Sequence, residues 1–251
     1  MDSDYEAFIV ELIQKGFEIA FHNAGSGAFS REETIKALEL FTKKLGIIPR
    51  LHINHYKNIE NIYWGNKRFY PPVQWLYNAV RPWYKPEGEV LGSPFFWGDI
   101  CKKYMKYIRN RVFSGINTLA YDRKMPYREK KKDKYSNYWF SSSDGANINV
   151  FNKLLCKKNV DKLVAQGGCC IIYTHFANGF VDEQGELDMD FKQNIEYLSK
   201  QNGWFATATE VLDYLLENRS ATYNRAGFLY QSGLDIIWFL QRIYRKWTVK
   251  I

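Results

Sequence analysis

Short apolar runs alternate with helical patterns over most of this 251-residue chain. Strands are expected at residues 17–21, 47–53, 169–174 and 204–206, and helices at residues 5–15, 30–45, 99–113, 150–166, 190–201, 210–218 and 228–247. Capping boxes at Ser30/Glu33 and Thr207/Glu210 mark two helix starts. Strands that alternate with helices form parallel βαβ units, so the sequence predicts an α/β protein, either a barrel or a doubly wound sheet.

The middle of the chain, residues 58–147, is long and less periodic, and we expect it to carry insertions that face a substrate. A chain of this length can bury a single core, and no Pro/Gly/Ser-rich linker divides it. We therefore expect one barrel domain over residues 1–220, followed by an amphipathic helical extension over residues 221–251.

The net charge of +8 admits a nucleic acid, an anionic membrane surface or an acidic substrate. The densest basic run, residues 128–134, includes two acids, and no recognisable nucleic-acid module accompanies the charge. We therefore expect no nucleic-acid partner. The first six residues are acidic and contain no apolar signal core, which predicts a cytoplasmic protein. The four cysteines lack the CxxC spacing of metal sites and are expected to be buried free thiols.

The last segment, residues 228–247, interleaves apolar and aromatic residues with basic ones. The commoner interpretation is a helix packed across the domain. The alternative is a peripheral helix on an anionic membrane surface, with Trp238, Phe239 and Trp247 inserted. Polar residues such as Asp235 interrupt the apolar run, so the segment is not expected to span a bilayer.

All four histidines of the chain lie at or just beyond an expected strand: His22, His52, His55 and His175. The carboxyl ends of parallel strands converge at one edge of such a fold, where its chemistry is usually found. The sequence therefore predicts a site at this edge that His22 and His175 share. The alternative is that these are ordinary histidines satisfied by local hydrogen bonds.

Two stretches carry a resemblance to a known family. Gly16-Phe-Glu-Ile-Ala-Phe-His22 resembles the second motif of the polysaccharide deacetylase superfamily, the NodB homology domain of carbohydrate esterase family 4. Gly168-Cys-Cys-Ile-Ile-Tyr-Thr-His175, with the helix, short strand and final helix that follow, is similar to its closing motif. The resemblance covers roughly residues 5–217 and implies a (β/α)7-type, TIM-like barrel that is incomplete at its N-terminus.

The resemblance also implies a reaction, the hydrolysis of an N- or O-acetyl group on a surface-polysaccharide sugar. In such hydrolases a divalent metal, here expected to be zinc, polarises the carbonyl and acidifies a bound water, an Asp acts as general base and a His protonates the leaving group. His22 matches the first metal histidine of the family, and His175 matches the catalytic acid.

This sequence departs from the family pattern in two places. The second metal histidine, four residues after the first, is replaced by Ser26, and only 16 residues precede the expected strand that should follow the Asp-Asp motif. Serine is a poor zinc ligand beside imidazole. Two interpretations follow: a fragment of a longer enzyme, or a non-catalytic carbohydrate-binding relative in a polysaccharide biosynthesis system.

Polar residues near the second expected strand extend the candidate site. His55, with Asn58 and Trp64, could replace the missing metal ligand, or could bind sugar hydroxyls by hydrogen bonding and ring stacking. His52 and Asn54 point to one side of an extended segment, His52 as a further metal candidate and Asn54 as a substrate contact.

Two carboxylates complete the candidates. Asp99 is expected to cap a helix, although an Asp at the strand edge could also contact substrate or metal. Asp144 ends the aromatic run that begins at Trp139, and we assign it to catalysis through substrate orientation.

Overall fold

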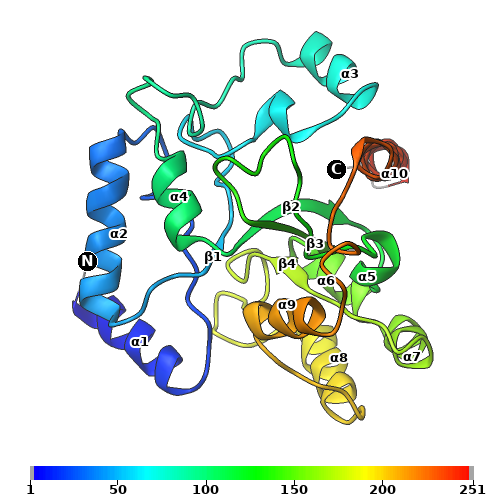
Figure 1. Cartoon of the computed structure of the whole chain (residues 1–251). Helices are drawn as coiled ribbons and strands as arrows, with labels where there is room; N and C mark the ends of the chain where they lie inside the picture. Colours follow the sequence, from blue (N-terminus) through cyan, green and yellow to red (C-terminus); the bar gives the residue numbers. More distant parts are fainter. Residues whose placement is uncertain (1–2, 249–251) are drawn as a thin grey trace. The chain divides into compact units, whose positions relative to one another are not determined.

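The computed structural model describes residues 3–248, with the side chains of residues 3–245, and shows an α/β protein (Figure 1). Its described strands form one sheet in the order β1 (Leu51–His52), β2 (Tyr107–Phe113), β3 (Tyr138–Gly145) and β4 (Ile172–Thr174). β1 pairs in parallel with β2, and β3 pairs in parallel with β4. The predicted α/β class with parallel strands is confirmed, and a seven-stranded barrel stays a prediction.

The helices alternate with these strands along the chain. They are α1 (Ser3–Gln14), α2 (Arg31–Leu45), the 3-10 helix η1 (Gly65–Arg68), α3 (Val73–Val80), α4 (Gly98–Tyr104), α5 (Thr118–Tyr121), α6 (Ile148–Leu154), α7 (Lys157–Ala165), α8 (Met189–Ser199), α9 (Ala208–Glu217) and α10 (Phe228–Thr248). The described chain forms two compact units, each built from several segments. Unit 1 comprises the described parts of residues 1–109, 126–140 and 207–236, and unit 2 those of residues 110–125, 141–206 and 237–251.

In unit 1, α2 begins and ends as its sequence predicts. The Ser30 side chain and the Glu33 carboxylate form a reciprocal capping box, and Gly46 closes the helix in the left-handed conformation at φ 68°. Lys44 of α2 reaches Glu6 of α1 at 2.8 Å. The buried core beneath includes Phe21 and Trp97, whose rings meet edge to face 5.9 Å apart.

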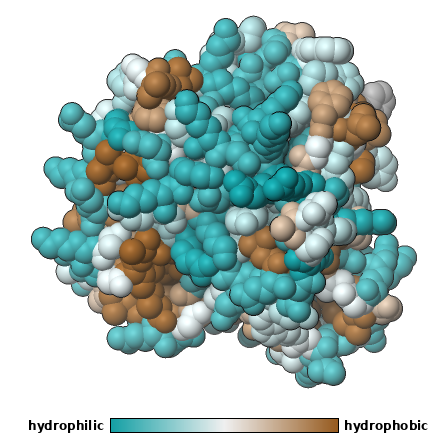
Figure 2. Space-filling view, in the orientation of Figure 1, coloured by the Kyte–Doolittle hydropathy of each residue, from teal (hydrophilic) through white to brown (hydrophobic). Residues whose placement is uncertain are grey.

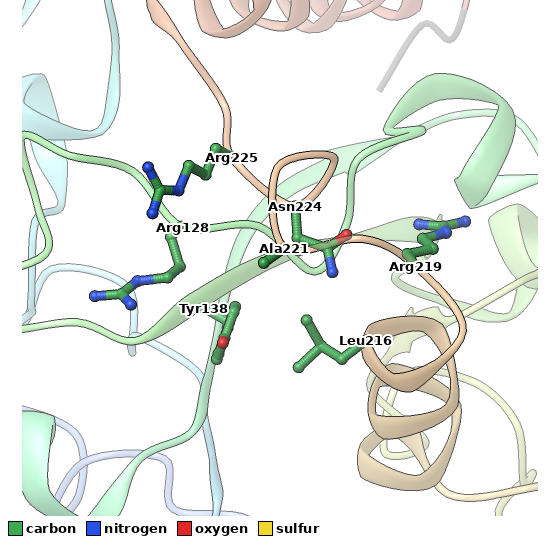
Figure 3. A pocket seen from close by; sticks show the side chains of 7 residues that line it. All are labelled: Arg128, Tyr138, Leu216, Arg219, Ala221, Asn224 and Arg225. Carbon is green, nitrogen blue, oxygen red and sulfur yellow. The ribbon is translucent and has the colours of Figure 1, made fainter.

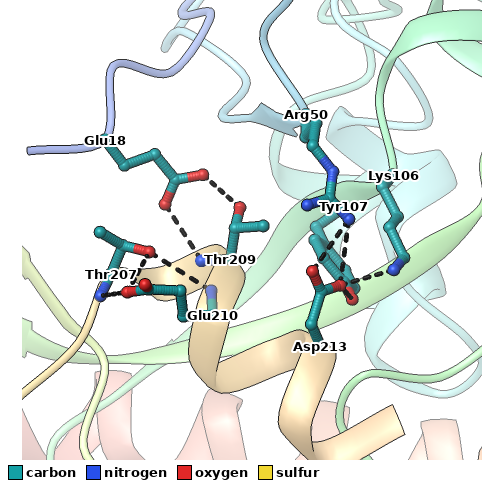
Figure 4. Close-up of polar contacts among 8 residues, drawn as sticks. All are labelled: Glu18, Arg50, Lys106, Tyr107, Thr207, Thr209, Glu210 and Asp213. Atoms are coloured by element: carbon teal, nitrogen blue, oxygen red, sulfur yellow. Dashed lines mark hydrogen bonds and ion pairs between the residues drawn. The ribbon is translucent and has the colours of Figure 1, made fainter. Parts of the chain in front are cut away.

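Polar contacts hold α9 in unit 1 (Figure 4). Glu18 accepts hydrogen bonds from the backbone N–H and the hydroxyl of Thr209 at the start of this helix. One turn later, Asp213 is bound by Arg50, by Lys106 and by the Tyr107 hydroxyl. Burial alone would raise the pKa of the Asp213 carboxyl, but these donors together lower it. The ion-pair network therefore fixes α9 against the chain around β1 and β2.

Unit 2 has its own apolar core. Phe151, Leu154 and Val160 of α6 and α7 are buried with Phe180, and the partly buried Phe191 of α8 packs on them. Phe151 and Phe180 meet edge to face at 5.2 Å. This core explains why α6, α7 and α8 pack together.

The helix expected over residues 99–113 is wrong. Only α4 forms there, and Tyr107–Phe113 is strand β2, almost wholly buried. Apolar residues at helical spacing suggested a helix, but the buried polar run Arg109-Asn110-Arg111 hid the strand pattern. The expected N-cap role of Asp99 is also wrong, because Trp97 precedes α4 and Asp99 lies in its first turn.

Other expected elements are shorter or absent. Residues 17–21 contribute only a bridge from Phe21 to His52, residues 47–53 form strand only at β1, and residues 204–206 form no strand. The expected helix over residues 150–166 is two helices, α6 and α7, separated at residues 155–156. Residues 17–21 and 47–53 therefore lie side by side as extended chain, and only a few of their residues form regular backbone pairs.

Strand β3 was not anticipated, because its centre is Ser141-Ser142-Ser143 rather than an apolar run. Side-chain hydrogen bonds make two of these serines, Ser141 and Ser143, compatible with burial. Ser141 donates to Asp122 at 2.6 Å, and Ser143 donates to the Gly115 carbonyl at 2.7 Å. Periodicity alone does not reveal a strand whose buried side chains are polar.

None of the described helices combines the length and the apolar character that crossing a bilayer requires. The helix expected over residues 228–247 forms as α10, in which Trp238 and Phe239 are half-buried. The Trp247 side chain and residues 249–251 lie outside the described part of the chain. Hydrophilic side chains cover most of the face in Figure 2, and apolar side chains gather on it in separate groups. Peripheral membrane contact through α10 stays a prediction.

All four cysteines are free thiols, as predicted, but only Cys101 is fully buried, and the other three are partly exposed. Burial raises the pKa of the Cys101 thiol, and it raises the pKa of Cys170 to about 12. Both side chains therefore stay protonated at neutral pH and are poor nucleophiles.

Candidate functional site

His22 and His55 lie together in unit 1. Their ring centroids are 4.8 Å apart, with the His22 side chain exposed and His55 partly buried. The backbone brings them together because Phe21, just before His22, bridges in parallel to His52 of β1. The two residues thus follow neighbouring extended segments, as the strand-end prediction expects.

The hydrogen bonds of the two rings indicate their tautomer. Nδ1 of His22 lies 2.6 Å from the Ile53 carbonyl oxygen, and Nδ1 of His55 lies 3.1 Å from the Tyr56 carbonyl oxygen. A carbonyl only accepts, so each neutral ring carries its proton on Nδ1 and its lone pair on Nε2. Metal-binding histidines are commonly oriented by such a bond from the other ring nitrogen.

A buried polar network supports the backbone around this pair. The Glu60 carboxylate is fully buried and accepts from Asn23 at 2.9 Å, from Asn58 at 2.6 Å and from the Phe29 backbone N–H at 3.3 Å. Asn23 in turn accepts from the backbone N–H of His55 at 3.2 Å. Asn23 has φ 61°, a left-handed conformation that Asn tolerates better than most residues. The network fixes the chain directly after His22 against the chain at His55.

A close backbone approach holds the Glu60 loop from the other side. The Trp97 indole N–H donates to the Glu60 carbonyl at 2.6 Å, and the Trp97 backbone N–H donates to the Gly88 carbonyl at 3.0 Å. A Cβ atom at position 88 would clash with the carbonyl oxygens of Glu60 and Asn61. Glycine is therefore required at this position.

His52 and Asn54 are enclosed rather than exposed. His52 is fully buried, with Nδ1 3.1 Å from the Phe21 carbonyl oxygen and Nε2 3.2 Å from the Asn54 side-chain oxygen. Asn54 also exchanges hydrogen bonds with the backbone of Ile62. Burial, the largest influence, lowers the pKa of His52 to about 4. This imidazole is a structural group in the core, and in its neutral form it donates to either the Phe21 or the Asn54 oxygen.

A small apolar pocket adjoins His22. It has a volume of about 250 Å³ and is lined by residues 20–24 together with Ala37, Leu40 and Phe41 of α2. His22 and Asn23 are the only polar residues of this lining. The pocket can take a small apolar group next to an imidazole.

The other candidates of unit 1 have structural partners. Asn58 is buried and bonds Gly25 and Gly27 as well as Glu60. Trp64 is half-buried beneath the Arg68 guanidinium, which lies 4.5 Å from its ring centroid. Asp99 forms a two-point ion pair with Arg31 at 2.6 and 2.7 Å, and this bonding lowers the pKa of its carboxyl.

In unit 2, Asp144 is almost wholly buried and forms an ion pair with Arg245 of α10. It also accepts from the backbone N–H of Ala146 at 3.1 Å and interacts electrostatically with Arg242. Across the sheet its partner in register is Tyr173 of β4. The carboxylate is thus already neutralised by a cation of its own unit.

His175 also belongs to unit 2 and is exposed just beyond β4, as its place in the sequence predicts. The Tyr173 hydroxyl lies 2.5 Å from its Nε2, and the two rings meet edge to face at 4.9 Å. Because His22 and His175 belong to different units, their shared pocket stays a prediction.

A second pocket of unit 1 is lined largely by polar residues (Figure 3). Its volume is about 210 Å³, and its lining includes Arg128, Arg219 and Arg225 and no carboxylate. In Figure 3 the guanidinium groups of Arg128 and Arg225 lie on one side and that of Arg219 on the other. They do not converge on one point, as an anion site would require.

The comparisons with known proteins identify no relative: no family model, curated protein or solved structure matches this chain. Within the described residues, no group of three or more His, Cys, Asp or Glu side chains could hold a metal ion. The His22–His55 pair offers two donors of the right kind, one fewer than the three protein ligands of a typical catalytic zinc site.

Proposed function

We propose that this chain is a carbohydrate-processing domain of the polysaccharide deacetylase type, acting on an acetylated sugar of a surface polysaccharide. The observation that carries the proposal is the His22–His55 pair, two adjacent imidazoles whose Nδ1 atoms face backbone carbonyls. The superfamily's (β/α)7-type barrel, a cytoplasmic location and a peripheral membrane contact belong to the same proposal.

The pair supports the binding of a divalent cation such as zinc. Imidazole is a common metal ligand, and Nε2 is the lone-pair nitrogen of both rings. When bound, the ion would polarise an acyl carbonyl and acidify water. The carbonyls of Ile53 and Tyr56 hold the two rings in orientation, and the Asn23–Glu60 network holds the loops beneath them.

The apolar pocket beside His22 supports an acyl substrate. An acetyl methyl group fits a lining of alanine, leucine and phenylalanine side chains, which gains free energy by leaving water. His175 is the proposed acid that protonates the leaving group. Asp144 is a less suitable base than its residue type suggests, because its carboxylate is almost wholly buried and ion-paired with Arg245.

That ion pair favours a second candidate function, carbohydrate binding without catalysis. A domain that has two imidazoles and whose candidate base is neutralised can still bind sugar hydroxyls through His22 and His55. The two functions differ in one measurable respect, because only the first releases acetate.

The proposed metal site is tested by zinc titration in a calorimeter. We expect one zinc ion per chain, and we expect His22→Ala and His55→Ala each to weaken binding at least about tenfold, the loss typical of metal-site changes. His175→Ala is the matched control and should leave the affinity unchanged. Unaltered zinc affinity in both His22→Ala and His55→Ala would contradict the proposed zinc site.

The proposed reaction is tested by measuring acetate release from a panel of N- and O-acetylated oligosaccharides in the presence of zinc. The hydrolase proposal expects release that falls in His22→Ala and in His175→Ala. Binding of the same oligosaccharides with no acetate release from any of them would instead select the non-catalytic function.

A further inference from the structure

An exposed apolar surface surrounds α3 in unit 1. We call Trp75, Leu76, Val80 and Trp83 the α3 surface; their exposed fractions are 66%, 48%, 68% and 76%. Trp75, Leu76 and Val80 lie on the outward side of the helix with the exposed Ala79, and Trp83 follows its end. The opposite side packs on η1 through the buried Val73 and through Tyr77, whose ring meets Phe69 at 5.2 Å.

Such a surface is unusual because large apolar side chains gain free energy when they leave water. Two exposed tryptophans stand beside two exposed aliphatic residues on one short segment. Tryptophan and tyrosine are enriched where protein meets the interface of a bilayer, since their rings combine an apolar body with a polar edge. In Figure 1, α3 stands apart from α2 and α4.

The segment that carries this surface is basic. Residues 61–86 contain no Asp or Glu, and of their four basic residues Arg81 and Lys85 are exposed, whereas Lys67 pairs with Glu89 at 2.5 Å and Arg68 is buried. Arg81 is exposed and donates to the Tyr56 hydroxyl at 2.9 Å, and Lys57 lies 5.4 Å from the Tyr56 ring centroid. Basic side chains therefore flank the exposed tryptophans, and Tyr56 links them to the loop that carries His55.

We propose that the α3 surface docks on an anionic lipid bilayer, with Trp75, Leu76, Val80 and Trp83 entering the interface and Lys57, Arg81 and Lys85 facing lipid headgroups. Apolar burial combined with attraction between basic residues and anionic lipid is the usual basis of interfacial binding. The surface is distinct from α10, and its docking does not depend on the proposed reaction.

Two other occupants fit less well. A sugar needs hydrogen-bonding side chains beside a stacking ring, but half of this surface is aliphatic and the neighbouring Gln74 donates to the Asn66 carbonyl. A second copy of the chain would place the same basic residues against one another in a two-fold interface. Anionic lipid complements both the apolar and the charged part.

The test is vesicle flotation of the full chain. The vesicles contain phosphatidylcholine alone, or phosphatidylcholine with an anionic fraction of phosphatidylglycerol. We expect flotation with anionic vesicles only, a blue shift of tryptophan fluorescence on binding, and loss of flotation at high salt. Trp75→Ala/Trp83→Ala should weaken partitioning at least about tenfold, because the variant lacks two rings whose apolar area leaves water when the protein binds the bilayer. Lys57→Gln/Lys85→Gln should also weaken partitioning to anionic vesicles.

The matched control is Trp204→Ala, which removes a tryptophan that is 60% exposed and belongs to unit 2. It should float like the wild type, and circular dichroism should show that all variants are folded. Equal flotation of wild type and the Trp75→Ala/Trp83→Ala variant would overturn the proposal. So would binding of the wild type to soluble polysaccharide but not to vesicles, or a dimer in solution that Trp75→Ala/Trp83→Ala dissociates.

Discussion

The two candidate clusters of this chain differ in what already surrounds their functional groups. In unit 1, His22 and His55 sit side by side near the surface, each oriented by a backbone carbonyl. In unit 2, the Asp144 carboxylate is buried against Arg245 and beside Arg242. His22 is exposed and His55 is partly exposed, whereas the Asp144 carboxylate is almost wholly buried.

The same contrast occurs within unit 1. His52 precedes His55 by three residues, yet it is fully buried between Phe21 and Asn54. One histidine supports the core and the other is a candidate ligand. Residue type identifies the chemistry that a side chain can perform, and its neighbours decide whether it remains available for that chemistry.

The largest expected effect on stability concerns the buried Asp144–Arg245 ion pair of unit 2. Arg245→Ala leaves the buried Asp144 charge without its partner and should lower the free energy of unfolding by about 3 kcal/mol. Denaturant unfolding measures this loss. The double variant Asp144→Ala/Arg245→Ala should recover part of it, because the buried carboxylate that lost its ion-pair partner is removed as well. Unchanged stability of Arg245→Ala would show that the carboxylate is not confined as described.

A similar loss should follow acidification, through His52. The pKa of His52 is about 4 in the folded chain and 6.5 ordinarily. Between these pH values the unfolded chain therefore binds a proton at His52 that the folded chain does not bind. The contribution of His52 is complete above pH 6.5 and falls as the pH drops towards 4, by about 3 kcal/mol in total. Unfolding free energies measured across this range should show that slope, and His52→Gln should flatten it.

A smaller loss should follow a change beneath the histidine pair. Glu60→Gln keeps the shape of the side chain but replaces one acceptor oxygen with an N–H₂ group, facing donors from Asn23, Asn58 or Phe29. A buried mismatch of this kind costs about 2 kcal/mol. Thermal unfolding measures it, with Glu32→Gln on the exposed face of α2 as the matched control. Equal melting of both variants would contradict the network.

The smallest effect on stability is expected at the pair itself. His22→Ala removes an exposed side chain and should change the free energy of unfolding by no more than about 0.5 kcal/mol. Its zinc affinity should nevertheless fall as described above. A large destabilisation with unchanged zinc affinity would contradict this prediction and would show that His22 is a structural residue rather than a metal ligand.

The sequence predicts best those elements that local chemistry determines. Both capping boxes form as expected, because Ser30 with Glu33 and Thr207 with Glu210 act within one helical turn. Strands β2 and β3 were missed because their buried residues include arginine, asparagine and serine. Only partners distant in the sequence, such as Asp122 for Ser141, make that burial favourable.

The candidate site shows the same division. The place of His22 and His55 after extended segments indicates that they could meet, and the structure brings them together. Glu60 and Asn23 were not anticipated, because a lone carboxylate in a loop looks like an exposed charge. The positive φ of Asn23 directly after His22 is a local signal, but the buried Glu60 carboxylate depends on three donors that only the folded chain collects.

The close contact between Gly88 and the Glu60 carbonyl can help to recognise homologues of this chain. Since no side chain fits between that residue and the Glu60 carbonyl, a homologue with the same loop must keep glycine there. A newly sequenced protein that pairs this glycine with a counterpart of Trp97 would be expected to share the loop, even when its overall similarity is faint. Gly88 and Trp97 are therefore sequence markers for distant homologues.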